Sequence, residues 1–383
     1  MSKDPKEFLL NCIKCYSPSG KEARYSQFLA NFLKESNIPV RFDQIGNLIA
    51  KKGSGAPILL LVSHMDTIPG ELPVYEENGK IYGRGAVDCK PSLAAMLYSF
   101  CDYELEEQDT GTIIFSGIVR EEDSLVGINE FVKSDVNPDF AIFGEPTNYD
   151  QICIGYKGRL CIGYKVNTKA GHVAASWEFV SANEICLEIW NIIKAVCWNL
   201  NEIHKEHDKK LKYFNKIIPN LSIISGGELT NCVPSKCVMY IDIRFPPKIS
   251  SKTILSEIRK AILDFKHVYS SQHQQDFKIH EQITSLLNGF EVKNNNILIG
   301  ALRWSIFNEC NIKPKLIKKT GTTFINKIGL HYKIPSITYG PGDPKLEHTD
   351  KEFVEIKEYL KVIEIYKRFY PKFFELFRRK IQK

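Results

Sequence analysis

The chain has 383 residues, 43% of them hydrophobic, and a formal net charge of +6. This length exceeds what one hydrophobic core usually serves, so we expect two domains, and the modest, dispersed charge argues against a nucleic-acid-binding protein. The sequence contains no run of eighteen apolar residues and no signal-peptide pattern, so we expect a soluble protein with no membrane segment.

The first part of the chain alternates between helix and strand patterns. Helices are expected around Phe8 and Cys12 and from Ser19 to Phe32, where Asn37 and Pro39 end the second. Strands follow at 40–42, 47–50 and 58–63, then a helix at 93–105, a strand at 111–117, a helix at 125–133 and a strand at 139–143. This order predicts an α/β layered domain with a mainly parallel sheet.

A second pattern begins after residue 155. Strands are expected at 159–166, 221–224, 238–245 and 277–280, with helices at 181–202 and 252–265. This βαββαβ order is typical of a ferredoxin-like α+β domain, an open antiparallel sheet with helices on one side. The first domain then resumes with a helix at 296–308, strands at 313–318 and 336–339, and a closing helix from Phe353. We therefore expect one domain over residues 1–155 and 293–383, interrupted by an inserted domain over 156–292.

The cysteines and the C-terminal segment have ordinary structural explanations. Eleven cysteines lack paired spacing, which favours reduced thiols in a cytoplasmic protein. Cys12 and Cys15 lie at helical spacing, and burial on one helix face explains them better than a metal or redox site. Basic residues alternate with phenylalanines from Lys367 onward, which indicates a docked terminal helix with a solvated face.

Ligand-type side chains follow three apolar strands. His64 ends the first, with Asp66 two residues later on the same side; Glu121 and Glu122 follow the second, and Glu145 follows the third. Because ligands bind at the carboxyl ends of strands in open α/β sheets, these side chains should meet at one edge.

Two loops add donors of the same kind. Asp88 follows Gly83-Arg84-Gly85, which lacks the third glycine of a dinucleotide-binding loop, and His348 lies in a turn-rich stretch before the last helix. Each residue taken alone has a structural explanation, such as helix capping for Asp88. Together, two histidines and three carboxylates suit zinc or a neighbouring divalent metal, with one carboxylate available to bridge two ions.

The motifs resemble those of the M20 family of metallopeptidases and deacylases in order and spacing: His64-x-Asp66, Gly83-Arg84-Gly85-x-x-Asp88-x-Lys90, Glu121-Glu122, Gly144-Glu145-Pro146 and Glu347-His348-Thr349. The resemblance implies two zinc ions per subunit, replaceable by cobalt, with Asp88 bridging them. His64 and Glu145 would complete one site, and Glu122 and His348 the other. It also implies that Asp66 supports His64 and that Glu121 is the general base.

Residues of the inserted domain match further family positions. The resemblance implies that His172 reaches the neighbouring subunit's site and stabilises the oxyanion, so that the protein is a homodimer. Asn231 and Arg244 match positions that hold the substrate's carboxylate, and Gly321 and Thr322 match positions that face substrate. From local sequence alone, a turn residue and a strand ion pair are the alternatives for His172 and Arg244.

The stretches KGRL, KKTGTT and TYGPGDPKLEHT are most similar to family members that release lysine or ornithine from an acidic amino-group carrier protein. The alternatives are a deacylase acting on N-acetylornithine, N-acetyllysine or succinyl-diaminopimelate, and a catalytically silent relative. Three features depart from the family pattern: Pro91 stands where glycine is common, Phe324 stands where aspartate is common, and the stretch 173–176 after His172 lacks a proline often found there. Pro91 suits a first helical turn, whereas Phe324 bears on substrate preference.

Overall fold

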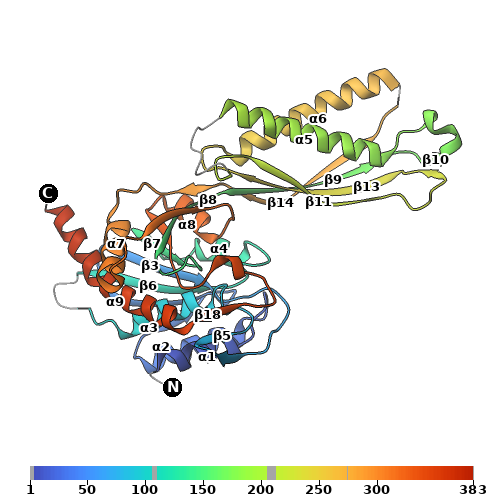
Figure 1. Cartoon of the computed structure of the whole chain (residues 1–383). Helices are drawn as coiled ribbons and strands as arrows, with labels where there is room; N and C mark the ends of the chain where they lie inside the picture. The colour runs from blue at the N-terminus through green and yellow to red at the C-terminus, as the bar shows by residue number, and fades with distance from the viewer. Residues whose placement is uncertain (1–3, 106–109, 205–212, 274, 383) are drawn as a thin grey trace. The chain divides into compact units, whose positions relative to one another are not determined.

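In the computed structural model, which describes residues 4–105, 110–204, 213–273 and 275–382, the chain divides into two units (Figure 1). Unit 1 comprises Met1–Ile154, Val292–Lys318 and Thr323–Lys383, and unit 2 comprises Gly155–Glu291 and Lys319–Thr322. Each has its own sheet and its own hydrophobic core.

Unit 1 alternates helices and strands along the chain. Its helices are α1 (Pro5–Lys14), α2 (Ala23–Glu35), α3 (Lys90–Asp102), α4 (Val126–Phe131), α7 (Ile297–Cys310), α8 (Phe324–Tyr332) and α9 (Ile356–Ile381). Its sheet strands are β1 (Val40–Phe42), β2 (Leu48–Ser54), β3 (Ile58–His64), β6 (Gly111–Ile118), β7 (Phe140–Gly144), β8 (Gln151–Tyr156), β16 (Lys315–Lys319) and β17 (Ser336–Thr338). A small separate sheet contains β4 (Tyr75–Glu77), β5 (Lys80–Tyr82) and β18 (Phe353–Glu355).

The central sheet has the order β1-β2-β6-β3-β7-β17-β8, and its middle strands β6, β3, β7 and β17 are parallel. Every residue of β6 and of β7 is buried, so both faces of the sheet are covered. Helix α3 contacts β3, β6 and β7, while α4 and α8 contact each other and strands of the same sheet. The expected α/β layered domain with a mainly parallel sheet is confirmed.

Unit 2 is built on an antiparallel sheet of order β11-β13-β9-β14. Its elements are β9 (Gly158–Asn167), β10 (Gly171–His172), the 3-10 helix η1 (Val173–Glu178), α5 (Ala182–Ile203), β11 (Ile218–Gly226), β12 (Cys232–Val233), β13 (Lys236–Phe245), α6 (Ser251–His273), β14 (Lys278–Leu287) and β15 (Phe290–Glu291). Both long helices cover one face of the sheet (Figure 1). Alternate residues of β9 and β13, such as Ile162 and Ile241, form the core with α5 and α6.

The C-terminal helix α9 is docked, as its pattern predicts. Its aromatic side chains Phe369, Phe373 and Phe374 are fully buried, while basic residues follow at its exposed end. The closing helix was expected from Phe353, which is wrong by three residues. Phe353–Glu355 instead forms β18, which pairs with β5 about 270 residues earlier in the chain, a partner that local periodicity does not reveal.

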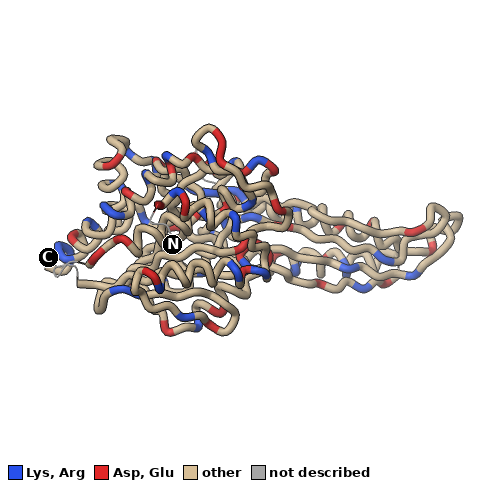
Figure 2. Tube along the Cα trace, turned by 90° about the horizontal axis from the view of Figure 1, so that it is seen from below, with Lys and Arg blue, Asp and Glu red and all other residues tan. Residues whose placement is uncertain are grey.

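None of the eleven cysteines forms a disulfide bond, and Cys12 and Cys15 are buried where α1 ends. Among the described residues, no helix has the length and apolarity needed to cross a bilayer. Acidic and basic residues are interspersed along both units (Figure 2).

Candidate metal centre

Three neighbouring parallel strands end at the same edge of the unit 1 sheet. Strand β3 lies between β6 and β7, with His64 opposite Ile118 and Ser63 opposite Gly144. The residues that follow these strands therefore emerge side by side. This register brings His64, the Glu121-Glu122 pair and Glu145 to one edge, and His64 and Glu145 are almost completely buried there.

Asp88 lies between two groups of possible metal donors. His64 Nε2 is 3.1 Å from Asp88 Oδ1 and 3.7 Å from Glu145 Oε1. His348 Nε2 is 3.2 Å from the other oxygen of Asp88, Oδ2, and 3.1 Å from Glu122 Oε2. Each oxygen of the Asp88 carboxylate therefore lies near a different histidine. A carboxylate that bridges two cations requires this arrangement.

The donor set fits zinc chemically. Each group supplies one imidazole nitrogen and carboxylate oxygens, which are ordinary zinc ligands. The thiol of Cys89 also lies near His64, Asp88 and Glu145. However, it makes hydrogen-bond contacts with Ser63 Oγ and the His64 carbonyl, and burial raises its pKa to about 12. Without metal, Cys89 is therefore a neutral thiol at physiological pH.

The carboxylates of this cluster lie so close together that positive charge is needed to offset their repulsion. Burial, together with repulsion from Glu122 and Asp88, raises the pKa of Glu121 to about 8 even though His64 opposes the shift. Burial would also raise the pKa of Asp88, but hydrogen bonds from His348 and His64 hold it below its ordinary range. Hydrogen bonds to Asp88 and Glu122 raise the pKa of His348 to about 11. Without metal, a protonated His348 therefore supplies positive charge that divalent cations would otherwise supply.

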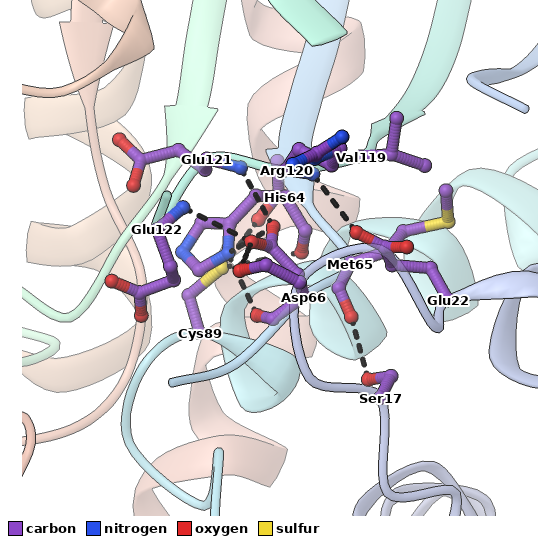
Figure 3. Close-up of polar contacts among 12 residues, drawn as sticks. Ser17, Glu22, His64, Met65, Asp66, Cys89, Val119, Arg120, Glu121 and Glu122 are labelled. Atoms are coloured by element: carbon purple, nitrogen blue, oxygen red, sulfur yellow. Dashed lines mark hydrogen bonds and ion pairs between the residues drawn. The ribbon is translucent and has the colours of Figure 1, made fainter. Parts of the chain in front are cut away.

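Asp66 connects His64 to the Glu121-Glu122 segment (Figure 3). Its Oδ1 accepts the backbone N–H of Glu121 at 2.9 Å, and its Oδ2 accepts the backbone N–H of Glu122 at 3.0 Å. His64 Nδ1 is 2.9 Å from the backbone carbonyl of Asp66 and 3.4 Å from its carboxylate. Figure 3 shows the two glutamate side chains directed away from Asp66. Asp66 therefore orients both the histidine and the acidic pair.

Sequence reasoning missed several side chains that support this arrangement. Ser19 donates to Asp66 Oδ2 at 2.7 Å, and buried Glu22 accepts the backbone N–H groups of Gly20 and Arg120. Thr323, the N-cap residue of α8, donates to Glu145 Oε1 at 3.1 Å. The capping-box pattern of Thr323 and Asn326 was the only sequence signal among these, and it indicates a helix start rather than a site.

A buried ion pair joins the loops that carry Asp88 and His348. Arg84 Nη1 lies 2.6 Å from Glu352 Oε1, and Arg84 also donates to the carbonyls of Gly70 and Thr349. Glu352 Oε2 accepts the backbone N–H of Gly85 at 2.8 Å. Both side chains are at least 94% buried. The pair thereby ties the loop before Asp88 to the loop after His348.

The remaining predicted residues lie in unit 2 and form two separate pairs. His172 of β10 is exposed and is opposite Cys232 in the ladder with β12, and Val173 donates its N–H to the Asn231 carbonyl. Arg244 Nη1 donates to Thr322 Oγ1 at 3.2 Å, next to exposed Gly321. The ten-residue strand β13 separates the two pairs, a span of roughly 30 Å at strand rise. Asn231 and Arg244 of one chain therefore cannot hold the same carboxylate.

The structure shows where Pro91 and Phe324, which depart from the family pattern, lie. Pro91 lies in the first turn of α3, as expected. Phe324 is buried and packs against Phe143 with ring centroids 6.4 Å apart. The aromatic side chain thus fills the core of unit 1.

Comparison with known proteins agrees with these motifs. A family model described as "Peptidase family M20/M25/M40" matches residues 60–372. A protein of Sulfurisphaera tokodaii named LysW-lysine/LysW-ornithine hydrolase is 31% identical over 353 residues, covering 92% of this chain and 91% of that protein. A relative from Pyrococcus furiosus, which bears the same name provisionally, is 32% identical over 368 residues, covering 94% of each chain.

A solved structure shares the fold. It is described as an M20 family metallo-carboxypeptidase of Sulfolobus solfataricus, and it superposes with a TM-score of 0.79 at 16% sequence identity. The match covers 98% of this chain and 100% of the other.

Proposed function

Because the chain belongs to peptidase family M20/M25/M40, we propose that it is a two-metal amide hydrolase that releases lysine, ornithine or both from an amino-group carrier protein. The bond to be cleaved joins the side-chain carboxyl of the carrier's terminal glutamate to the α-amino group of the released amino acid. This step belongs to lysine and arginine biosynthesis. The observation that carries the hydrolase assignment is the division of the two Asp88 oxygens between two donor groups.

His64, Asp88 and Glu145 would hold one zinc ion, and Asp88, Glu122 and His348 the other, with cobalt as a substitute. Bound there, the metals would polarise the scissile carbonyl and lower the pKa of the attacking water. Glu121 is the general base: it accepts a proton from that water and delivers it to the leaving amine.

The inserted domain, unit 2, serves dimerisation and substrate binding in this proposal. Strand β11 is an edge strand of its sheet, and Ile223 and Ile224 are 54% and 44% exposed. An exposed apolar edge strand is a template for pairing with a second copy. A dimer would also let His172 and Asn231 act in the partner's active site, whereas Arg244, Gly321 and Thr322 act in their own.

A complementation experiment tests the shared site. Glu121→Gln and His172→Gln subunits are each expected to be inactive, and mixed dimers are expected to regain activity because one site per dimer is intact. Mixtures that stay inactive although exchange is verified would contradict the shared site. A monomer by light scattering would contradict the dimer itself.

An acidic carrier is consistent with the net charge of +6, which favours encounter with a negatively charged partner. We infer that the protein is cytoplasmic, because eleven cysteines without a disulfide bond suit a reducing compartment.

The direct test incubates zinc-loaded protein with carrier-linked lysine and carrier-linked ornithine and measures free amino acid by mass spectrometry. Release of either amino acid is expected, and no release at any metal loading would refute the proposal. N-acetylornithine, N-acetyllysine and succinyl-diaminopimelate are assayed in parallel, and faster turnover of one of them would identify a small-molecule deacylase.

A further inference from the structure

A cavity of about 330 Å³ opens on one face of the unit 1 sheet, beside its edge strand β1. Residues of β1 and β2, the starts of β3 and β6, and the loop after α4 line it. The metal donors follow the last residues of β3 and β6, whereas the cavity lies at Ile58 and Thr112, near the first residues of these strands. Roughly 20 Å of strand therefore separates the cavity from the metal centre. Its volume suits a small molecule.

The register of the sheet forms an apolar floor in this cavity. Ile49 of β2 is opposite Arg41 of β1, and Ile114 of β6 is opposite Lys51 of β2. Directly opposite and alternate residues of paired strands lie on the same face, so both isoleucines belong to the face that bears the cavity. Ile49 and Ile114 are 4% and 6% exposed, and Val136 in the loop after α4 is 6% exposed. These three lining side chains form a recessed apolar floor.

Charged residues surround the mouth of the cavity. Arg41 forms an ion pair with Asp135 that joins β1 to the loop after α4, and the two side chains are 51% and 78% exposed. Lys51 is exposed as well, and it forms no ion pair with any residue in the described part of the chain. Two cationic side chains and one carboxylate leave an excess of positive charge at the mouth. The Lys51 ammonium group is therefore available to an anionic ligand.

A ligand of this cavity must match both its floor and its mouth. An apolar body removes the floor from water, and one carboxylate accepts hydrogen bonds from the Lys51 ammonium group while Arg41 stays paired with Asp135. We propose that the cavity binds a small monocarboxylic acid with an apolar body. This inference goes beyond the proposed hydrolase function and does not depend on it, because the cavity lies at the opposite edge of the sheet from the metal donors.

The test titrates hexanoate into zinc-loaded, full-length protein and measures binding by isothermal titration calorimetry. Hexanoate should bind one-to-one with a Kd of about a millimolar or below. Affinity should rise from acetate through butanoate to hexanoate by about fourfold for each added methylene group, because each one contacts the apolar floor. Acetate also measures any binding of a carboxylate to the metals alone. Hexanamide and hexylamine, which lack the negative charge, should bind more weakly than hexanoate.

Two variants locate the binding site. Ile114→Phe fills the recess with a larger side chain and should abolish hexanoate binding. Lys51→Gln should weaken hexanoate binding by about fivefold to tenfold and leave hexanamide binding unchanged, because only the acid uses the ammonium group. Lys51 is exposed, so this variant keeps the test valid if Ile114→Phe lowers the Tm severely.

Lys315→Gln is the matched control for Lys51→Gln. Lys315 is 72% exposed and lies on β16, which pairs with β8 in another part of the sheet. The control variant removes the same charge from the protein and should bind hexanoate as the wild type does.

Three results would overturn the inference. The first is no saturable binding of hexanoate, and the second is equal binding in the wild type, Ile114→Phe and Lys51→Gln, which would place the acid elsewhere. The third is loss of self-association in Ile114→Phe, measured by light scattering, which would show that a second copy of the chain occupies the cavity. None of these results bears on hydrolysis at the metal centre, which the release assay tests separately.

Discussion

The carboxylate of Asp66 accepts hydrogen bonds from the backbone of both Glu121 and Glu122, so one side chain fixes the segment that carries a proposed metal donor and the proposed base. The two glutamates are neighbours in sequence but differ in their surroundings. Glu122 lies against His348, whereas Glu121 contributes to neither group of donors. This difference supports the separate roles proposed for them.

Glu121→Gln should therefore lower kcat by roughly 10²- to 10⁴-fold, because an amide cannot accept the proton of the attacking water. Metal content, measured by elemental analysis after dialysis, should match the wild type. Unchanged kcat would contradict the mechanism and favour a catalytically silent relative.

The buried Arg84–Glu352 pair should act on the metals through the loops that it joins. Glu352→Gln is expected to weaken metal binding by about 10- to 100-fold, because loss of the charge loosens the segments that carry Asp88 and His348. Competition with a chromophoric chelator measures this affinity.

Asp350→Asn is the control for Glu352→Gln, since Asp350 lies in the same loop, 3.9 Å from Arg84, but is 98% exposed. It should leave metal affinity unchanged. Equal weakening in both variants would show that loop charge, rather than the buried pair, is responsible.

Helix α9 packs large aromatic side chains into the core of unit 1. Phe373 is fully buried and meets Phe140 of β7 edge-to-face, with ring centroids 5.1 Å apart. Phe373→Ala should lower the free energy of unfolding by about 3–5 kcal/mol, because it leaves a cavity between the helix and the sheet. Urea denaturation followed by circular dichroism measures the change.

Ile381→Ala on the same helix is the matched control, because Ile381 is 69% exposed. Its effect should stay within about 0.5 kcal/mol. A comparable loss in both variants would contradict the docking of α9 as the source of stability.

For the molecule as a whole, the acidic cluster predicts how stability depends on pH without metal. Glu121 keeps its proton up to about pH 8 when folded but loses it near its ordinary value of 4.5 when unfolded. Between these values the folded state binds more protons, so stability falls as pH rises. His348, with its pKa raised to about 11 from 6.5, acts in the same direction above neutral pH.

Chelator-treated protein should consequently show a Tm that decreases from pH 5 to pH 9, and added zinc should raise the Tm most at the alkaline end. Differential scanning fluorimetry across this range measures both effects, with Glu121→Gln expected to flatten the metal-free curve. A metal-free Tm that rises with pH would contradict the electrostatic account.

The sequence by itself determined most of the helices and strands and the positions of the site residues. Apolar periodicity located β3, β6 and β7, and ligand-type side chains at their ends indicated a metal centre. These signals are local, because strand periodicity and strand-end polarity are properties of a few consecutive residues. Local pattern did not predict β18, whose partner β5 lies about 270 residues away.

Only the tertiary structure decided which residues meet. The order β6-β3-β7 and the division of the Asp88 oxygens between two histidines depend on packing between segments far apart in the chain. The same holds for the separation of Asn231, which precedes β13, from Arg244 near the end of that strand, and for the register that sets Arg159 opposite Arg244. Strand register follows from burial of a whole sheet face, so no single motif encodes it.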